Sequence, residues 1–166
     1  RELANVPDAM IRDMATYLAS FSAPSAGAVP PDVKARNVIA QAAARAPAPS
    51  AAQRQFEGSC GACHHEGEGP KLLGVNTPLA LNTNVHSDDP DNLIQIILQG
   101  LQAPPSREVG FMPSFRHSLN DAQIADIVGW MRSRYAPDRP AWDQLPQRVA
   151  QLRHQLREAP ANPSRP

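Results

Sequence analysis

Prolines break this chain into segments and leave one long stretch suited to building a core. The 166 residues include 18 prolines, a fraction roughly twice the usual ~5 %. They are densest before residue 50 and after residue 136, where Ala and Ser are also common. Residues 50–138 combine cysteine, glycine and aromatic residues with helical periodicity. We therefore predict four parts, namely a helix in 1–22, a Pro/Ala-rich linker in 23–49, a folded domain in 50–138 and a tail in 139–166.

Apolar residues recur at helical spacing in five segments, and no segment alternates as a half-buried strand would. The expected helices cover residues 8–21, 50–59, 91–101, 120–135 and 144–158. Ser50 and Asn120 begin two of them and are residue types that cap helix N-termini. The sequence thus predicts an all-α fold with long loops.

The balanced charge of the chain argues against nucleic acid as a partner. The chain has 16 Lys plus Arg against 16 Asp plus Glu, so no whole-chain basic field points to nucleic acid. No apolar run approaches the roughly 20 residues that a membrane-spanning helix needs. We expect no nucleic-acid binding and no membrane segment within this chain.

The tail differs in charge from the domain before it. Residues 139–166 have five basic and two acidic side chains, whereas residues 50–138 have six basic and ten acidic ones. The tail also has a narrow apolar stripe, and an isolated helix of this length is marginal in water. We expect the tail either to fold back on the acidic domain or to bind a partner subunit with Trp142 as its anchor.

Both cysteines of the chain lie in one motif, Cys60-Gly61-Ala62-Cys63-His64. This CxxCH pattern is typical of c-type haem attachment. Two thiols at this spacing reach the two vinyl groups of one porphyrin, and the adjacent imidazole coordinates the iron. A zinc site normally needs four ligands, a redox-active thiol pair would lie near a βαβ pattern, and a structural disulfide would not explain the histidine. These three remain as alternatives to one covalent haem c.

Met112 is the expected second axial ligand of the iron. It stands 48 residues after His64, in an apolar loop (GFMPSF) that Gly and Pro interrupt. Met131 belongs to a helical apolar stripe, which favours core packing, and His86 and His117 have polar neighbours, which favours exposure. Ordinary packing of Met112 is the alternative. A thioether ligand favours reduced iron and suits electron transfer.

With these motifs in order, residues 50–135 resemble a small class I cytochrome c domain. The resemblance implies a cytochrome c fold of three to four helices around a covalent haem, here with an N-terminal linker helix and a C-terminal tail helix. It implies that Phe56 of the first helix packs on Trp130 of the last, near the haem. It also implies that the Pro70 carbonyl orients the proximal histidine.

The first helix repeats the pattern of the last helix of that domain. Residues 8–20 align with residues 121–133 at a constant offset of 113, with Asp, Ala, Ile, Asp and Ser coinciding and Tyr17 aligned with Trp130. An unrelated amphipathic helix is the alternative, because Asp-Ala-x-Ile is a common pattern. A fixed offset is typical of tandem copies. We therefore expect residues 1–22 to be the last helix of a preceding cytochrome domain, and further haems would lie in such domains.

A narrower resemblance rests on this repeat, on VHSDDPDNLIQIILQGLQ, on the GFMPSF loop and on Arg139-Pro-Ala-Trp142. Together they are similar to the C-terminal domain of multihaem cytochrome c subunits of bacterial periplasmic dehydrogenases, either molybdenum aldehyde/nicotinate-type or alcohol dehydrogenase-type. This implies residence in the periplasm or at the periplasmic face of the cytoplasmic membrane. It also implies dehydrogenase partners, including molybdopterin and iron–sulfur subunits, and an acceptor in the respiratory chain.

The expected function is electron transfer as a domain or subunit of an oxidoreductase complex, without catalysis of its own. No acid–base pair stands near Met112, because Arg107, Glu108 and Arg116 fit loop surface or haem-propionate contacts. The alternative is a haem enzyme or gas sensor with a displaceable distal ligand.

Overall fold

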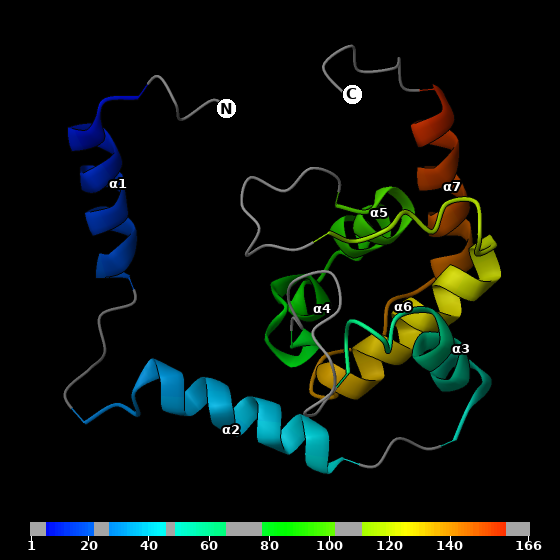
Figure 1. The fold of residues 1–166 in the computed structure, drawn as a ribbon, viewed down its shortest axis with the longest axis horizontal. Coiled ribbons are helices and arrows are strands. Elements are labelled where there is room, and N and C mark those ends of the chain that lie inside the picture. Colours follow the sequence, from blue (N-terminus) through cyan, green and yellow to red (C-terminus); the bar gives the residue numbers. More distant parts are fainter. Residues whose placement is uncertain (1–5, 22–26, 46–48, 66–77, 102–110, 159–166) are drawn as a thin grey trace. The chain divides into compact units, whose positions relative to one another are not determined.

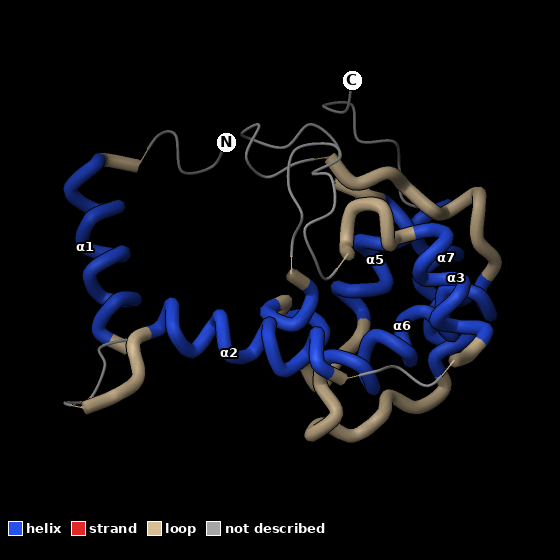
Figure 2. Tube along the Cα trace, turned by 60° about the horizontal axis from the view of Figure 1, so that its bottom comes forward, coloured by secondary structure: helices blue, strands red, loops and turns tan. Residues whose placement is uncertain are grey.

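The computed structural model describes residues 6–21, 27–45, 49–65, 78–101 and 111–158. All regular structure in these ranges is helical (Figures 1 and 2), apart from one isolated antiparallel bridge between Leu101 and Met112. The predicted all-α class is confirmed. None of the helices in the described ranges has the length and apolar character to cross a membrane.

Five helices match the segments that periodicity predicts. They are α1 (Asp8–Ser20), α3 (Ala51–Ser59), α5 (Asp91–Gln99), α6 (Asp121–Tyr135) and α7 (Leu145–Glu158). The Ser50 hydroxyl accepts a hydrogen bond from the Gln53 amide at 3.0 Å. Asn120 and Gln123 form a reciprocal capping box at the start of α6. Both predicted N-caps are therefore confirmed.

Three further elements are not predicted by the sequence patterns. They are α2 (Pro31–Ala44), the 3₁₀ turn η3 (Leu79–Leu81) and α4 (Thr83–His86). α2 lies inside the segment expected to be a linker, and Pro31 is tolerated there because the first helical turn needs no backbone donor at that position. Its buried residue is Ala42, which gives a weak apolar signal.

Contacts divide the chain into two units, residues 1–36 and 37–166. The first unit contains α1, which has no buried residue. The large apolar side chains of α1 and of Phe21, which follows it, are all exposed: Met10, Ile11, Met14, Tyr17, Leu18 and Phe21.

The core of the second unit is built around α6, which contacts α3, α4, α5 and α7. The predicted apolar stripe of α6 is buried throughout: Ile124, Ile127, Val128, Met131 and Tyr135. α5 adds Leu93, Ile94, Ile97 and Leu98, and α7 adds Leu145, Val149 and Leu152. The same core therefore includes a helix of the basic tail.

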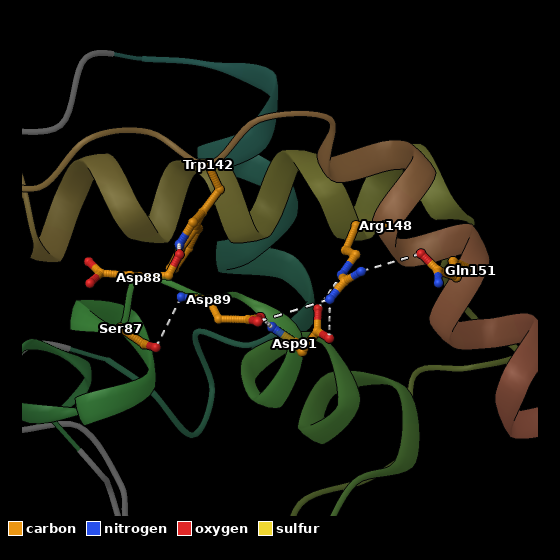
Figure 3. A network of polar contacts seen from close by, with 7 residues as sticks. All are labelled: Ser87, Asp88, Asp89, Asp91, Trp142, Arg148 and Gln151. Atoms are coloured by element: carbon orange, nitrogen blue, oxygen red, sulfur yellow. Dashed lines mark hydrogen bonds and ion pairs between the residues drawn. The ribbon is translucent and has the colours of Figure 1, made fainter.

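The contacts of the tail favour folding back over partner binding. α7 packs on α5 and α6 of its own unit. Trp142, expected as an anchor for a partner, donates from its ring nitrogen to the Asp88 carbonyl at 3.1 Å (Figure 3). It also lies against the Arg132 guanidinium. Its ring is thus engaged inside this unit, and whether Trp142 also anchors a partner subunit stays a prediction.

Candidate haem site

The CxxCH motif forms a tight turn at the end of α3. The amides of Cys60 and Gly61 both donate to the Phe56 carbonyl, at 2.7 and 3.0 Å. The amides of Cys63 and His64 then both donate to the Cys60 carbonyl, at 3.1 and 2.9 Å. These bonds hold the two thiols and the imidazole in one compact segment of fixed backbone.

Glycine at the second position of the motif follows from the close approach of α3. A Cβ atom added to Gly61 would lie 2.7 Å from the Glu57 carbonyl oxygen. A side chain there would push the motif away from the last helical turn, so the turn geometry depends on this glycine.

The state of the thiols bears on the alternatives to a haem. Cys60 and Cys63 are both free and half-buried. Burial, with a smaller contribution from Cys63, raises the pKa of the Cys60 thiol to about 11. Redox-active thiols usually have a lowered pKa, so this setting does not suit a redox pair. The described residues contain no group of three or more His, Cys, Asp or Glu that could hold a metal ion.

Phe56 and Trp130 meet where α3 packs on α6. Their ring centroids are 4.6 Å apart and the rings are inclined by 36°. Phe56 is buried in the core, and Trp130 is half-buried with its ring edge-on to Tyr135. The contact between these rings is the one that the resemblance implies, and their place beside a haem stays a prediction.

The methionine loop is tied to the end of α5. Met112 is half-buried against the core. Its amide and carbonyl pair with those of Leu101, at 3.2 and 2.9 Å. Two residues further on, the Ser114 hydroxyl donates to the Leu98 carbonyl at 2.5 Å. The backbone of this loop is therefore set before the proline by Leu101, just after α5, and after the proline by α5 itself.

Gly100 makes this pairing possible. It has φ +70°, and an added Cβ would lie 2.7 Å from the Pro113 carbonyl carbon and from the Ser114 nitrogen. Periodicity indicates Gly100 only as a helix stop. The structure shows that the residue also lets the methionine loop approach α5.

The other candidates for the second axial ligand differ in burial and in their contacts. Met131 is buried, as predicted for a core residue, and His117 is exposed, as predicted. His86 is half-buried, contrary to the expected exposure, because its Nε2 lies 2.9 Å from the Ala80 carbonyl oxygen. That contact occupies one of its ring nitrogens.

Three predicted residues fall outside the described residues, namely Pro70, Arg107 and Glu108. Arg116 is half-buried, and its Nε lies 3.3 Å from the His117 ring. Whether Arg116 meets a haem propionate stays a prediction.

Sequence reasoning missed the role of Arg132, which is only 2 % exposed. It donates to the carbonyls of Val85, Ser87 and Pro140 at 2.7, 3.0 and 2.9 Å, and its guanidinium carbon lies 4.3 Å from the centre of the Trp142 ring. It thereby fastens one carbonyl of α4 and two loop carbonyls to α6. An arginine inside the apolar stripe of a helix was the signal that could have found it.

The residues present fit a covalent haem. Cys60 and Met112 come from distant parts of the sequence, yet both pack against the same apolar core. The motif supplies two sulfurs and an imidazole, and the loop supplies a thioether. These are the donor groups that a His/Met-ligated haem c would need.

Comparisons with known proteins agree with this site. A family model described as cytochrome C oxidase, cbb3-type, subunit III matches residues 47–131. The chain is 41 % identical over 152 residues to a nicotinate dehydrogenase subunit of Pseudomonas putida, and the match covers 92 % of this chain and 12 % of that protein. It is 32 % identical over 85 residues to the cytochrome c subunit of alcohol dehydrogenase (quinone) of Gluconobacter oxydans, and the match covers 49 % of this chain and 18 % of that protein.

The chain therefore spans less than a fifth of the length of these relatives. The matched family segment contains the CxxCH motif, the methionine loop and most of α6. These matches confirm the resemblance to the cytochrome c subunits of dehydrogenases. The chain is a c-type cytochrome that belongs to the family of cytochrome c oxidase, cbb3-type, subunit III, and its cofactor is covalently bound haem c.

Proposed function

We propose that residues 50–138 transfer electrons through one haem c whose iron is ligated by His64 and Met112. Cys60 and Cys63 would hold the porphyrin through thioether bonds. The observation that carries this proposal is that the CxxCH turn and the methionine loop border one apolar core. When bound, the haem supplies a one-electron couple of its iron.

The chain's own residues would set how that couple behaves. The Met112 thioether is a soft ligand, which favours reduced iron and raises the potential. The pairing of Met112 with Leu101, just after α5, fixes the backbone of Met112, so the ligand need not rearrange between oxidation states. Two protein ligands leave no open iron position for a substrate. This supports electron transfer in place of catalysis.

Replacing Met112 tests the ligand assignment. Met112→Ala should remove the methionine–iron charge-transfer band that oxidised His/Met cytochromes show in the far red, and should let the reduced protein bind carbon monoxide. Met131→Ala is the matched control, because it removes a buried thioether from the core and should cost roughly 2–5 kcal/mol of stability without loss of the band. If His86→Ala or His117→Ala removes the band and Met112→Ala does not, the assignment is wrong.

The proposed electron donor is a dehydrogenase with molybdopterin and iron–sulfur subunits, and the proposed acceptor lies in the respiratory chain. The match to the nicotinate dehydrogenase relative extends over 92 % of this chain, whereas the match to the alcohol dehydrogenase relative covers about half of it. This difference favours the molybdenum type. An affinity-tagged protein purified from its own organism should carry molybdenum in stoichiometric amount. Co-purification of a quinoprotein without molybdenum would assign the other type.

The proposed location is the periplasm or the periplasmic face of the cytoplasmic membrane. Covalent attachment of haem c in this family takes place outside the cytoplasm. An exported form of the chain should therefore carry thioether-linked haem, and the same chain without an export signal should not. Equal haem content in the two forms, measured by mass under denaturing conditions, would contradict this location.

We further propose that residues 1–22 are the last helix of a second, preceding cytochrome domain. Ile11, Met14 and Leu18 of α1 are exposed, whereas their counterparts at the offset of 113 are buried in α6. A longer polypeptide that includes the preceding sequence should carry more than one haem. It should also lose stability when Leu18 is changed to Ser. A longer polypeptide with a single haem would contradict this domain division.

A further inference from the structure

The segment that follows Met112 is held from two sides. On one side, Leu101, just after α5, pairs with Met112, and the Phe115 amide donates to the Ile97 carbonyl of α5 at 3.0 Å. On the other side, the segment reaches a side chain of α7, Arg153. The helix of the tail thus contacts the segment that leads from the proposed ligand to α6.

Arg153 uses two of its guanidinium nitrogens on this segment and the third on the first residue of α6, Asp121. Its Nε lies 2.6 Å from a carboxylate oxygen of Asp121, and one terminal nitrogen lies 2.9 Å from the Leu119 carbonyl oxygen. The other terminal nitrogen donates to the Arg116 carbonyl. The Arg153 side chain is only 11 % exposed. Charge-assisted bonds of this kind, shielded from water, are stronger than surface ion pairs.

α7 is anchored independently of Arg153. Leu145, Val149 and Leu152 are buried in the core. Arg148, one turn earlier, forms a bidentate pair with Asp91 at the start of α5, seen from close by in Figure 3. Removing the Arg153 contacts alone would therefore leave α7 docked. An Arg153 variant can therefore report on the methionine loop without undocking α7.

We infer that Arg153 is a positioning residue for the axial ligand Met112, and that α7 serves as the fixed support from which it acts. The inference rests on the proposed Met112 ligation. A methionine–iron bond opens when the loop that carries the thioether moves away from the iron. Each bond between the loop and a fixed helix raises the cost of that movement, so the Arg153 contacts would slow it.

The rate at which imidazole replaces Met112 measures this opening directly. In the oxidised holoprotein with saturating imidazole, loss of the far-red band is limited by loop opening. Arg153→Gln should increase this limiting rate about tenfold or more, because at least one charge-assisted hydrogen bond is lost. Arg153→Lys should give an intermediate rate, because an ammonium cannot reach all three partners at once.

Two variants of α7 serve as matched controls. Arg148→Gln removes the same charge and a bidentate pair from the same helix, but its partner lies on α5. Arg157→Gln removes an exposed charge near the end of α7. Both should keep the wild-type rate within about twofold. Arg148→Gln should lower the midpoint of thermal unfolding. A lower midpoint with an unchanged opening rate would show that global stability alone does not set the rate.

The outcomes separate this inference from the proposed function. If Met112→Ala removes the band and Arg153→Gln leaves the imidazole rate unchanged, the role of Arg153 is refuted while the ligand stands. An equal rise in Arg148→Gln and Arg153→Gln would also refute it, because the effect would then belong to α7 as a whole. If Met112→Ala keeps the band, the ligand assignment itself fails. If Arg153→Gln does not fold, Arg153→Lys decides by the same comparison.

Discussion

At the scale of single residues, the conformation of the methionine loop depends on Gly100, which has no side chain to obstruct the loop. Gly100 lies under the Pro113–Ser114 peptide with a positive φ. A non-glycine residue would pay a conformational cost of about 1–2 kcal/mol at such a φ. It would also meet backbone atoms that cannot rotate away. The position of Met112 thus follows from a residue twelve positions earlier in the chain.

Gly100→Ala should therefore destabilise the domain by roughly 2–4 kcal/mol, from the positive φ and the backbone clash together. It should also weaken the far-red band, because the loop must move. Gly58→Ala is the matched control, since an added Cβ there meets nothing within 4 Å and alanine favours the helix. Urea unfolding and the oxidised spectrum measure both effects. Equal stability of the two variants would contradict this role of Gly100.

At the scale of elements, α7 makes the tail part of the cytochrome domain. Its apolar stripe is buried against α5 and α6. Arg148 and Arg153 pair with the acidic residues Asp91 and Asp121 of those two helices. Hydrogen bonding to Asp91 also raises the pKa of Arg148. Two basic residues of the tail are therefore paired with acidic residues of the domain within one unit.

Leu152→Ala should cost roughly 2–5 kcal/mol of unfolding free energy, because it leaves a cavity where α7 meets the core. Leu156 lies one turn further on and is only partly buried, so Leu156→Ala should cost clearly less. Thermal or urea unfolding of the two holoproteins gives the comparison. If neither variant lowers stability, α7 is not docked in the way the structure shows.

The elements also show what a single sequence can predict. The amphipathic helices and their caps follow from local patterns, and the CxxCH motif identifies the cofactor because all three groups are close in sequence. α2 was missed because alanine-rich residues among prolines carry little periodic signal. The Arg153 contacts were missed for a different reason. They join residues 34 and 37 positions apart, and no local pattern encodes them.

At the scale of the whole molecule, we expect a haem to add to a core that the described helices share unevenly. The buried side chains come mainly from α5, α6 and α7, whereas α3 contributes Phe56. α3, which carries the CxxCH turn, packs on α6. The apolar porphyrin would therefore supply much of the contact between the CxxCH turn and the rest of the domain.

Loss of both attachment thiols should accordingly give a colourless and largely unfolded domain. Cys60→Ala alone should retain at most one thioether bond, and Cys60→Ala with Cys63→Ala should retain none. Absorbance, far-ultraviolet circular dichroism and mass under denaturing conditions report haem content and folding together. A double variant with unchanged thermal stability would show that the protein core suffices without the haem.

The central claim is that this domain passes single electrons through an iron with both axial positions occupied by protein. A spectroelectrochemical titration of the exported holoprotein, repeated under nitrogen and under carbon monoxide, tests it most directly. Carbon monoxide binds reduced haem iron, so it raises the midpoint potential only if a position is open or readily vacated. We predict a one-electron transition with the same midpoint under both gases. A higher midpoint under carbon monoxide would contradict the claim and favour a haem enzyme or gas sensor with a displaceable distal ligand.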